Sequence, residues 1–176
     1  MNTVLEQLNC GDVFRDCIGD KHIVVRKEGE KVYVLRKELL PEMMEFGESN
    51  DWRTSAIREY LHGEYLNVLK NRFGEDNILP HETNLLSLDG LKNYESIVDM
   101  VSLMTLDDYR LNRDVIGENI GCQWWLATAD STPSGCGAGY VLHIGQKGDV
   151  TYDDFFCAKG VRPFFALKSS TIVFVD

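Results

Sequence analysis

The 176-residue sequence lacks the features of exported, membrane-spanning and disulfide-bonded proteins. No stretch approaches the roughly 18 apolar residues that a membrane-spanning helix needs, and no basic segment of a signal peptide opens the chain. The cysteines are odd in number and scattered, without a C-x-x-C pair, so they indicate neither zinc binding nor redox chemistry. We therefore expect a cytoplasmic protein without membrane contact, whose reduced thiols lie in or near the core: Cys10, Cys17, Cys122, Cys136 and Cys157.

Catalytic patterns are also absent from the sequence. No histidine belongs to a G-x-S-x-G, H-E-x-x-H or related pattern. The alternating glycines within 131–139 lie in an expected loop rather than between a strand and a helix, so they form no phosphate cradle. We therefore expect no enzymatic activity and no cofactor, and we expect each histidine at the surface or half buried: His22, His62, His81 and His143.

Positive charge is scarce, because the formal net charge is −10 at pH 7. Residues 51–120 contain 13 acids and 7 bases, whereas residues 121–176 contain 5 acids and 4 bases. A negative surface repels the phosphate backbone, so direct nucleic-acid binding is not expected, and the acidity can also serve solubility alone. The pairs Asp107–Asp108 and Asp153–Asp154 lack the spacing of a calcium loop, and we expect them to be solvated rather than to bind a metal.

Apolar residues are present in the amount that one core requires. They make up 44% of the chain, so residues 1–176 are expected to form a single domain. Hairpins are predicted from 23–25 to 32–35, with Gly29 in the turn, and from 140–144 to 147–152. A helical turn at 106–110 and a long loop at 131–139 separate further strands, which are expected at 101–104, 122–128, 161–167 and 171–175. The predicted fold class is α+β, with a small mixed or antiparallel sheet and long loops.

One main amphipathic helix is predicted over residues 55–69. Ser55 is placed to cap the exposed amides of its first turn, and Trp52 is expected to seal the helix entrance. Apolar side chains recur at helical spacing and are expected to pack against the sheet: Ile57, Leu61, Tyr65 and Val68.

Two adjacent tryptophans, Trp124 and Trp125, stand in the strand predicted at 122–128. Adjacent residues of a strand point to opposite faces, so one ring can enter the core while the other reaches an exposed face. An exposed tryptophan there would anchor a partner. In the alternative, both rings are covered, one by the core and one by the loop at 131–139.

Two arginines, Arg58 and Arg162, lie among apolar neighbours in the sequence. We expect each guanidinium to donate charge-assisted hydrogen bonds to a carboxylate or to backbone carbonyls at the edge of the core. Both residues are therefore predicted to be structural.

Five sequence blocks occur in an order that resembles the uncharacterised domain family DUF6273, which is common in Firmicutes and their phages. The blocks are D-W-R-T-S-A-I-R-E-Y-L at 51–61, L-L-S-L-D-G at 85–90, V-S-L-M-T-L-D-D-Y-R at 101–110, W-W-L-A-T at 124–128 and G-V-R-P at 160–163. The resemblance covers most of the chain, from the first hairpin to Leu167. It implies no function, because none is assigned to that family and one fold hosts many functions.

The W-W-L strand and the late G-V-R-P strand also look like the distant pattern of C-type-lectin-like and formylglycine-generating-enzyme-like domains. This resemblance implies a binding scaffold that carries long loops on a small sheet. The chain has no E-P-N or Q-P-D triplet, so calcium-dependent sugar binding is not implied. It also lacks the closely spaced reactive cysteine pair of the enzymes, because Cys136 and Cys157 are far apart.

The leading functional hypothesis is a non-enzymatic module that binds a macromolecule, expected to be a protein, with a glycan as the other class. The alternative is a phage-encoded acidic inhibitor of a nucleic-acid-binding host defence enzyme, such as an anti-CRISPR, which would use the acids between Asp51 and Glu118. An enzyme with an unrecognised site is the third hypothesis. For the leading hypothesis, the loop at 129–139 and the hairpin at 147–154 form the partner surface, with these residues: Trp125, Asp130, Tyr140, Tyr152, Asp153 and Asp154.

Overall fold

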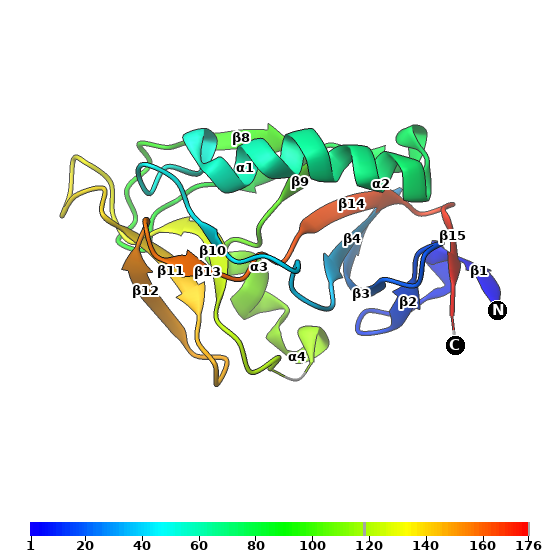
Figure 1. Cartoon of the computed structure of the whole chain (residues 1–176). Helices are drawn as coiled ribbons and strands as arrows, with labels where there is room; N and C mark the ends of the chain where they lie inside the picture. The colour runs from blue at the N-terminus through cyan, green and yellow to red at the C-terminus, as the bar shows by residue number, and fades with distance from the viewer. Residues whose placement is uncertain (118, 176) are drawn as a thin grey trace.

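The computed structural model describes residues 1–117 and 119–175, so Glu118, which bounds the acidic segment, lies outside the described residues. The fold is α+β, with a curled antiparallel sheet and one main helix across one of its faces (Figure 1). The sheet has the strand order β1-β15-β2-β3-β4-β14-β6, and β9 pairs with β14. Its strands are β1 (Asn2–Val4), β2 (Val13–Arg15), β3 (Lys21–Glu28), β4 (Lys31–Arg36), β6 (Ile78–Leu79), β9 (Val101–Ser102), β14 (Phe164–Lys168) and β15 (Ile172–Phe174).

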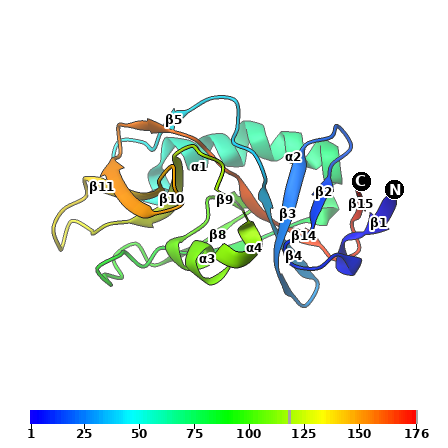
Figure 2. The same ribbon diagram turned by 90° about the horizontal axis from the view of Figure 1, so that it is seen from below.

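A second, three-stranded sheet with the order β10-β11-β12 lies at the end of the molecule opposite the chain termini (Figures 1 and 2). It consists of β10 (Trp124–Ala129), β11 (Tyr140–Ile144) and β12 (Val150–Asp154). Two short antiparallel ladders complete the strands: β5 (Met44–Glu45) with β13 (Ala158–Lys159), and β7 (His81–Asn84) with β8 (Ser96–Asp99).

The main helix begins as predicted but ends later. The Ser55 hydroxyl accepts a hydrogen bond from the backbone N–H of Arg58, and the helix runs through α1 (Ala56–Tyr60), a π-helical turn (Leu61–Tyr65) and α2 (Leu66–Phe73). The prediction that Val68 is a core position is wrong, because Val68 is half buried and Leu69 takes its place. A regular α-helix has about 3.6 residues per turn, so residues spaced four apart shift gradually around the helix axis. The π-helical turn has more residues per turn and compensates for this shift. The core positions therefore follow one another at four-residue spacing: Ile57, Leu61, Tyr65, Leu69 and Phe73.

The central strands are buried on both faces, which explains their continuous apolar sequence. On β14, Phe165 points into the cluster below the main helix, whereas Phe164 points into a second cluster on the other face. The second cluster is covered by α3 (Leu106–Leu111) and α4 (Arg113–Ile116), which lie on the side opposite the main helix (Figure 2). The two hairpins, the turn at Gly29 with its φ of 58°, and the loop at 131–139 agree with the sequence prediction.

Within residues 1–117 and 119–175, no helix has both the length and the apolar character needed to cross a lipid bilayer.

Three of the four histidines lie in the core, so the expectation of surface or half-buried rings is wrong for them. His22, His81 and His143 are at most 3% exposed. Their rings pack as aromatic groups: His22 stacks on Phe14 with centroids 5.3 Å apart, and His143 meets Trp125 edge-on at 5.8 Å. Burial lowers the pKa of His81 to about 4, so this ring is neutral at physiological pH.

The cysteines are free thiols, and the expectation that they lie in or near the core is wrong for all of them except Cys157, which packs against the core. Cys10, Cys17, Cys122 and Cys136 are exposed, and Cys157 is half buried. All five lie in turns or irregular segments outside the strands, where the chain runs over the surface.

Thiol titration without reductant should recover five thiols from the denatured protein, because no disulfide is formed among the described residues. In the native state four thiols should react first and Cys157 last, because burial raises the pKa of the Cys157 thiol and the thiolate is the nucleophile. A Cys157→Ser variant should lose only the slow phase. Recovery of three thiols or one from the denatured protein would show that disulfides form.

Candidate binding surface

Both tryptophans of the W-W pair are buried, so the expectation that one ring is exposed is wrong and its alternative, in which both are covered, is correct. Trp124 packs edge-on against Tyr109, with ring centroids 5.7 Å apart, on the α3 side of the sheet. Of the two tryptophans, the sequence prediction had assigned only Trp125 to the partner surface.

Trp125 cannot serve as a surface anchor because its ring is 0% exposed. Phe46 packs edge-on against it at 5.8 Å, and the Lys159 ammonium lies 5.2 Å from a ring centroid. The indole N–H donates to the carbonyl of Met44 at 2.9 Å. These contacts come from β5, β13 and their neighbouring segments rather than from the loop at 131–139, which was expected to cover one of the rings.

The strand register divides the remaining predicted site residues between two faces. Tyr140 pairs with Asp154, and Val141 pairs with Asp153. Directly paired residues share a face, and neighbours along a strand alternate, so Tyr152 and Asp154 lie on the same face as Tyr140. Asp153 lies on the opposite face, with Trp125.

Tyr140 and Tyr152 form an exposed aromatic pair on this face. Their side chains are 45% and 54% exposed, and their ring centroids are 5.2 Å apart. Tyr152 belongs to β12, which pairs only with β11 among the described strands and is therefore an edge strand. The two rings stand on a hairpin whose other residues on that face are Leu142 and Ile144, which are buried, and Val150, which is 40% exposed.

Two acidic residues lie next to Tyr140 in the strand register. Asp154 lies directly across from Tyr140, and the backbone N–H of Asp130 donates to the Tyr140 carbonyl at 3.1 Å. Both acids are half buried, and within the described part of the chain neither forms an ion pair with a lysine or arginine. We call Asp130, Tyr140, Tyr152 and Asp154 the tyrosine surface.

The loop at 131–139 is attached firmly at its base. The Asn50 amide donates to the carbonyls of Ser131 and Tyr140 at 2.9 and 3.0 Å, and its carbonyl oxygen accepts from the Tyr94 hydroxyl at 2.7 Å. The Ser131 hydroxyl donates to Asp89 at 2.6 Å. The side of the loop nearest the tyrosine surface is therefore fixed, while residues 133–136 are exposed.

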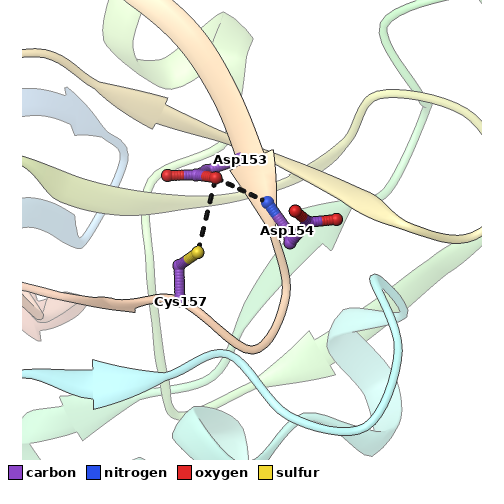
Figure 3. A group of neighbouring side chains, drawn as sticks. All are labelled: Asp153, Asp154 and Cys157. Carbon is purple, nitrogen blue, oxygen red and sulfur yellow. Dashed lines mark hydrogen bonds between the residues drawn. The ribbon is translucent and has the colours of Figure 1, made fainter.

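The Asp153 carboxylate forms hydrogen bonds within the protein. It accepts from the Cys157 thiol at 3.4 Å and from the backbone N–H of Asp154 at 2.9 Å (Figure 3). It also accepts from the Lys159 ammonium at 2.7 Å. The Lys159 ammonium holds the pKa of Asp153 below its ordinary value. Asp153, Asp154 and Cys157 bring three potential metal ligands together, but calcium takes six to eight oxygens and Lys159 already neutralises Asp153, so we assign no metal to them.

In the other acid pair Asp107 is exposed, as expected, whereas Asp108 is half buried. Asp108 forms an ion pair with Arg26, and its carboxylate accepts from the Thr105 backbone and hydroxyl, which caps α3. Asp107 forms an exposed ion pair with Arg110 at 2.7 Å. Part of the acidic excess of the middle segment is therefore neutralised locally.

The sequence prediction missed a buried carboxylate, Asp99, which is 0% exposed. Three hydrogen-bond donors around it come from separate elements at 2.7 to 2.8 Å: Trp52 Nε1, Thr83 Oγ1 and Arg58 Nε. His62 Nε2 lies 3.1 Å from Asp99 Oδ1, which is an ion pair when the imidazole is protonated. The prediction that Arg58 binds a carboxylate is confirmed. The spacing of Arg58 and His62, one turn apart on the helix, was a signal for a shared acceptor.

No protein-family description matches this chain, and neither the curated proteins nor the solved structures include a significant match. The functional argument therefore depends on the geometry of the described residues.

Proposed function

We propose that the protein is a non-enzymatic binding module that recognises a protein partner through the tyrosine surface, on a scaffold related to DUF6273 and C-type-lectin-like domains. The observation that carries the proposal is the exposed pair of Tyr140 and Tyr152. Tyrosine provides a large contact area and a hydroxyl at low entropic cost, and it is enriched among the residues that dominate binding free energy. A rigid hairpin below the rings keeps that cost low.

The flanking carboxylates define the chemistry of the partner. Asp130 and Asp154 provide negative charge beside two aromatic faces, and this combination suits a lysine or arginine side chain that inserts between them. The net charge of −10 would speed the approach of a basic partner. We therefore propose a partner segment that combines a basic residue with apolar neighbours.

Alanine substitution of the tyrosines tests the proposal. A partner isolated from a bacterial lysate should bind Tyr140→Ala and Tyr152→Ala at least about 30-fold more weakly than the wild type, since hot-spot residues contribute about 2 kcal/mol or more. The dissociation constant should be measured by calorimetry with the purified partner. Asp130→Asn and Asp154→Asn should mainly reduce the association rate and its dependence on salt.

Phe174→Ala is the matched control, because Phe174 is an aromatic residue with 38% exposure on β15, at the other end of the molecule. The Phe174→Ala variant should bind the partner with the affinity of the wild type. Unchanged affinity in both tyrosine variants would contradict the proposal. If charge reversal of exposed acids within 51–117 then abolished a salt-sensitive interaction, the acidic-inhibitor hypothesis would replace it. A partner that proves to be an oligosaccharide would also overturn the assignment to a protein.

A further inference from the structure

Arg162 is a buried cation without a carboxylate partner among the described residues. Its side chain is among the largest that are fully buried, and the residue is 2% exposed. One hydrogen bond is formed, from Nε–H to the carbonyl of Arg36 at 2.9 Å, as predicted for a structural arginine. The guanidinium carbon also lies 5.0 Å from a Trp124 ring centroid, a cation–π contact. No carboxylate among the described residues neutralises its charge, and an unneutralised buried charge is costly.

A small cavity opens beside this guanidinium. Its volume is about 60 Å³, and its lining includes Arg162, Arg113 and Lys147 together with Tyr109 and Trp124. No aspartate or glutamate among the described residues contributes to the lining. A water needs roughly 10 to 15 Å³ of such volume, so the cavity has room for a group of a few heavy atoms and not for a nucleotide.

Gly148 keeps the mouth of the cavity open. It adopts a φ of +78°, and a Cβ at this position would lie 3.2 Å from Arg113 Nη2 and 3.4 Å from the Tyr109 hydroxyl. The Tyr109 hydroxyl donates to the Gly148 carbonyl at 2.8 Å, which fixes the turn between β11 and β12 against α3. This hydrogen bond therefore holds the turn that carries Lys147 close to α3.

A second hollow of about 360 Å³ shares Arg162 with the first and adds Lys37, again without a described acid in its lining. The two hollows also share Ile116, Gly117, Asn119 and Ile120. The two hollows are therefore adjacent, and Arg162 lines both.

The residues around this cavity carry positive charge, whereas the whole protein has a net negative charge. Burial lowers the pKa of Arg162 to about 10, as expected for a guanidinium without a counter-charge. Burial raises the pKa of Tyr109, and Arg113 and Arg162 act in the opposite direction. Asp149 acts on Tyr109 as well, but it lines neither hollow.

We propose that this cavity is a binding site for a small oxyanion, either a phosphate or the phosphoryl or carboxylate group of a larger molecule. The planar guanidinium of Arg162 provides two parallel N–H donors that match two oxygens of such a group. Arg113 and Lys147 supply charge at the mouth. This site is separate from the tyrosine surface, although one hairpin carries both, since Tyr140 opens β11 and Lys147 lies in the turn after it.

Calorimetric titration of the purified full chain with inorganic phosphate tests the proposal, with sodium chloride keeping the ionic strength constant. We expect saturable binding to one site, and a second titration with acetate shows whether a carboxylate suffices. Arg162→Lys retains the charge but loses the paired donors and should bind at least about tenfold more weakly, as expected for lost charge-assisted hydrogen bonds. Arg113→Gln and Lys147→Gln, at exposed positions, should weaken binding without unfolding the protein.

Arg110→Gln is the matched control, because it removes one positive charge from the neighbouring turn of α3 at a residue that lines neither hollow. It should bind phosphate as the wild type does, as should Tyr140→Ala, so failure of this proposal and failure of the proposed protein-binding function are distinguishable. Absence of phosphate and acetate binding, or an equal loss in Arg110→Gln and Arg113→Gln, would overturn the proposal. Binding that appears only in a Glu118→Gln variant would also overturn it, because the cations would then serve the chain's own carboxylate.

Discussion

Replacement of Asp99 by alanine should lower the free energy of unfolding by about 3 to 5 kcal/mol, the range observed when one partner of a buried ion pair is removed. The carboxylate is 0% exposed and accepts from the helix, from β7 and from the segment before α1. Without it the Trp52 N–H, the Thr83 hydroxyl and the Arg58 guanidinium lose their acceptor together. Urea denaturation of both proteins measures the difference.

Two further variants separate charge from shape in this cluster. Asp99→Asn retains the size of the side chain but leaves an amide that cannot accept from every donor, so its loss should be smaller than that of Asp99→Ala. Thr83→Val removes one hydrogen bond of 2.7 Å and should cost about 1 to 3 kcal/mol, since a buried acceptor loses one of several donors. An Asp99→Ala protein as stable as the wild type would show that the carboxylate is not a structural centre.

Acid should destabilise the protein in the same cluster at a defined pH. Burial alone would raise the pKa of Asp99, but the neighbouring His62 and the hydrogen bonds from Trp52 and Thr83 outweigh it and lower the pKa from 3.8 to about 2. The unfolded chain therefore binds a proton first, so this stabilisation is present above pH 3.8 and is lost as the pH falls towards 2. His81 adds an earlier loss between pH 6.5 and 4, because its pKa is also lower in the folded state. Asp99→Asn should reduce the lower step without removing it, because the pKa of Asp16 is also lowered, to about 2.

The parts of the fold that depend on local sequence were predictable. Gly29 marks the first hairpin turn, Ser55 marks the start of the main helix, and each is found in that role. Alternation also predicted that Trp124 and Trp125 would point to opposite faces. It could not show that both faces would be covered, because the covering residues Phe46 and Tyr109 lie in distant segments.

The partners of polar residues were the parts that local sequence could not provide. Asp99 lies 41 residues after Arg58, and no helical or strand periodicity in the sequence connects the two positions. The basic cavity likewise joins Arg113, Lys147 and Arg162 from three segments of an acidic chain. The net charge of −10 predicted repulsion of anions as an average over the surface, whereas binding depends on the local field.

The tyrosine surface was predicted in part for a related reason. Period-two alternation could separate Tyr152 and Asp154 from Asp153 once the strand at 150–154 was recognised, but it did not indicate which face would be covered. The cover over Asp153 comes from Lys159 and Cys157, which return to the hairpin after β12. Only the tertiary arrangement shows that Asp154 flanks an exposed aromatic pair while Asp153 stabilises the interior.

Truncation of Leu61 to alanine should cost roughly 2 to 5 kcal/mol, because the lost transfer free energy and the resulting cavity add together. Leu61 is 0% exposed, at the first position of the π-helical turn, and belongs to the cluster between the main helix and the sheet. Its neighbours on the buried stripe, Ile57 and Tyr65, are fixed on the same helix four residues before and after it, so the structure can close the cavity only in part. The free energy of unfolding from urea titration measures the loss.

Leu111→Ala is the matched control for this prediction, since it makes the same chemical change at a residue that is 75% exposed at the end of α3. Its effect should stay within about 0.5 kcal/mol, as is usual for exposed substitutions. Val68→Ala, at the half-buried position that the helical spacing had placed in the core, should fall between the two. If Leu61→Ala costs less than about 0.5 kcal/mol, the buried stripe at four-residue spacing does not carry the packing of the helix, since a filled core site loses more than that.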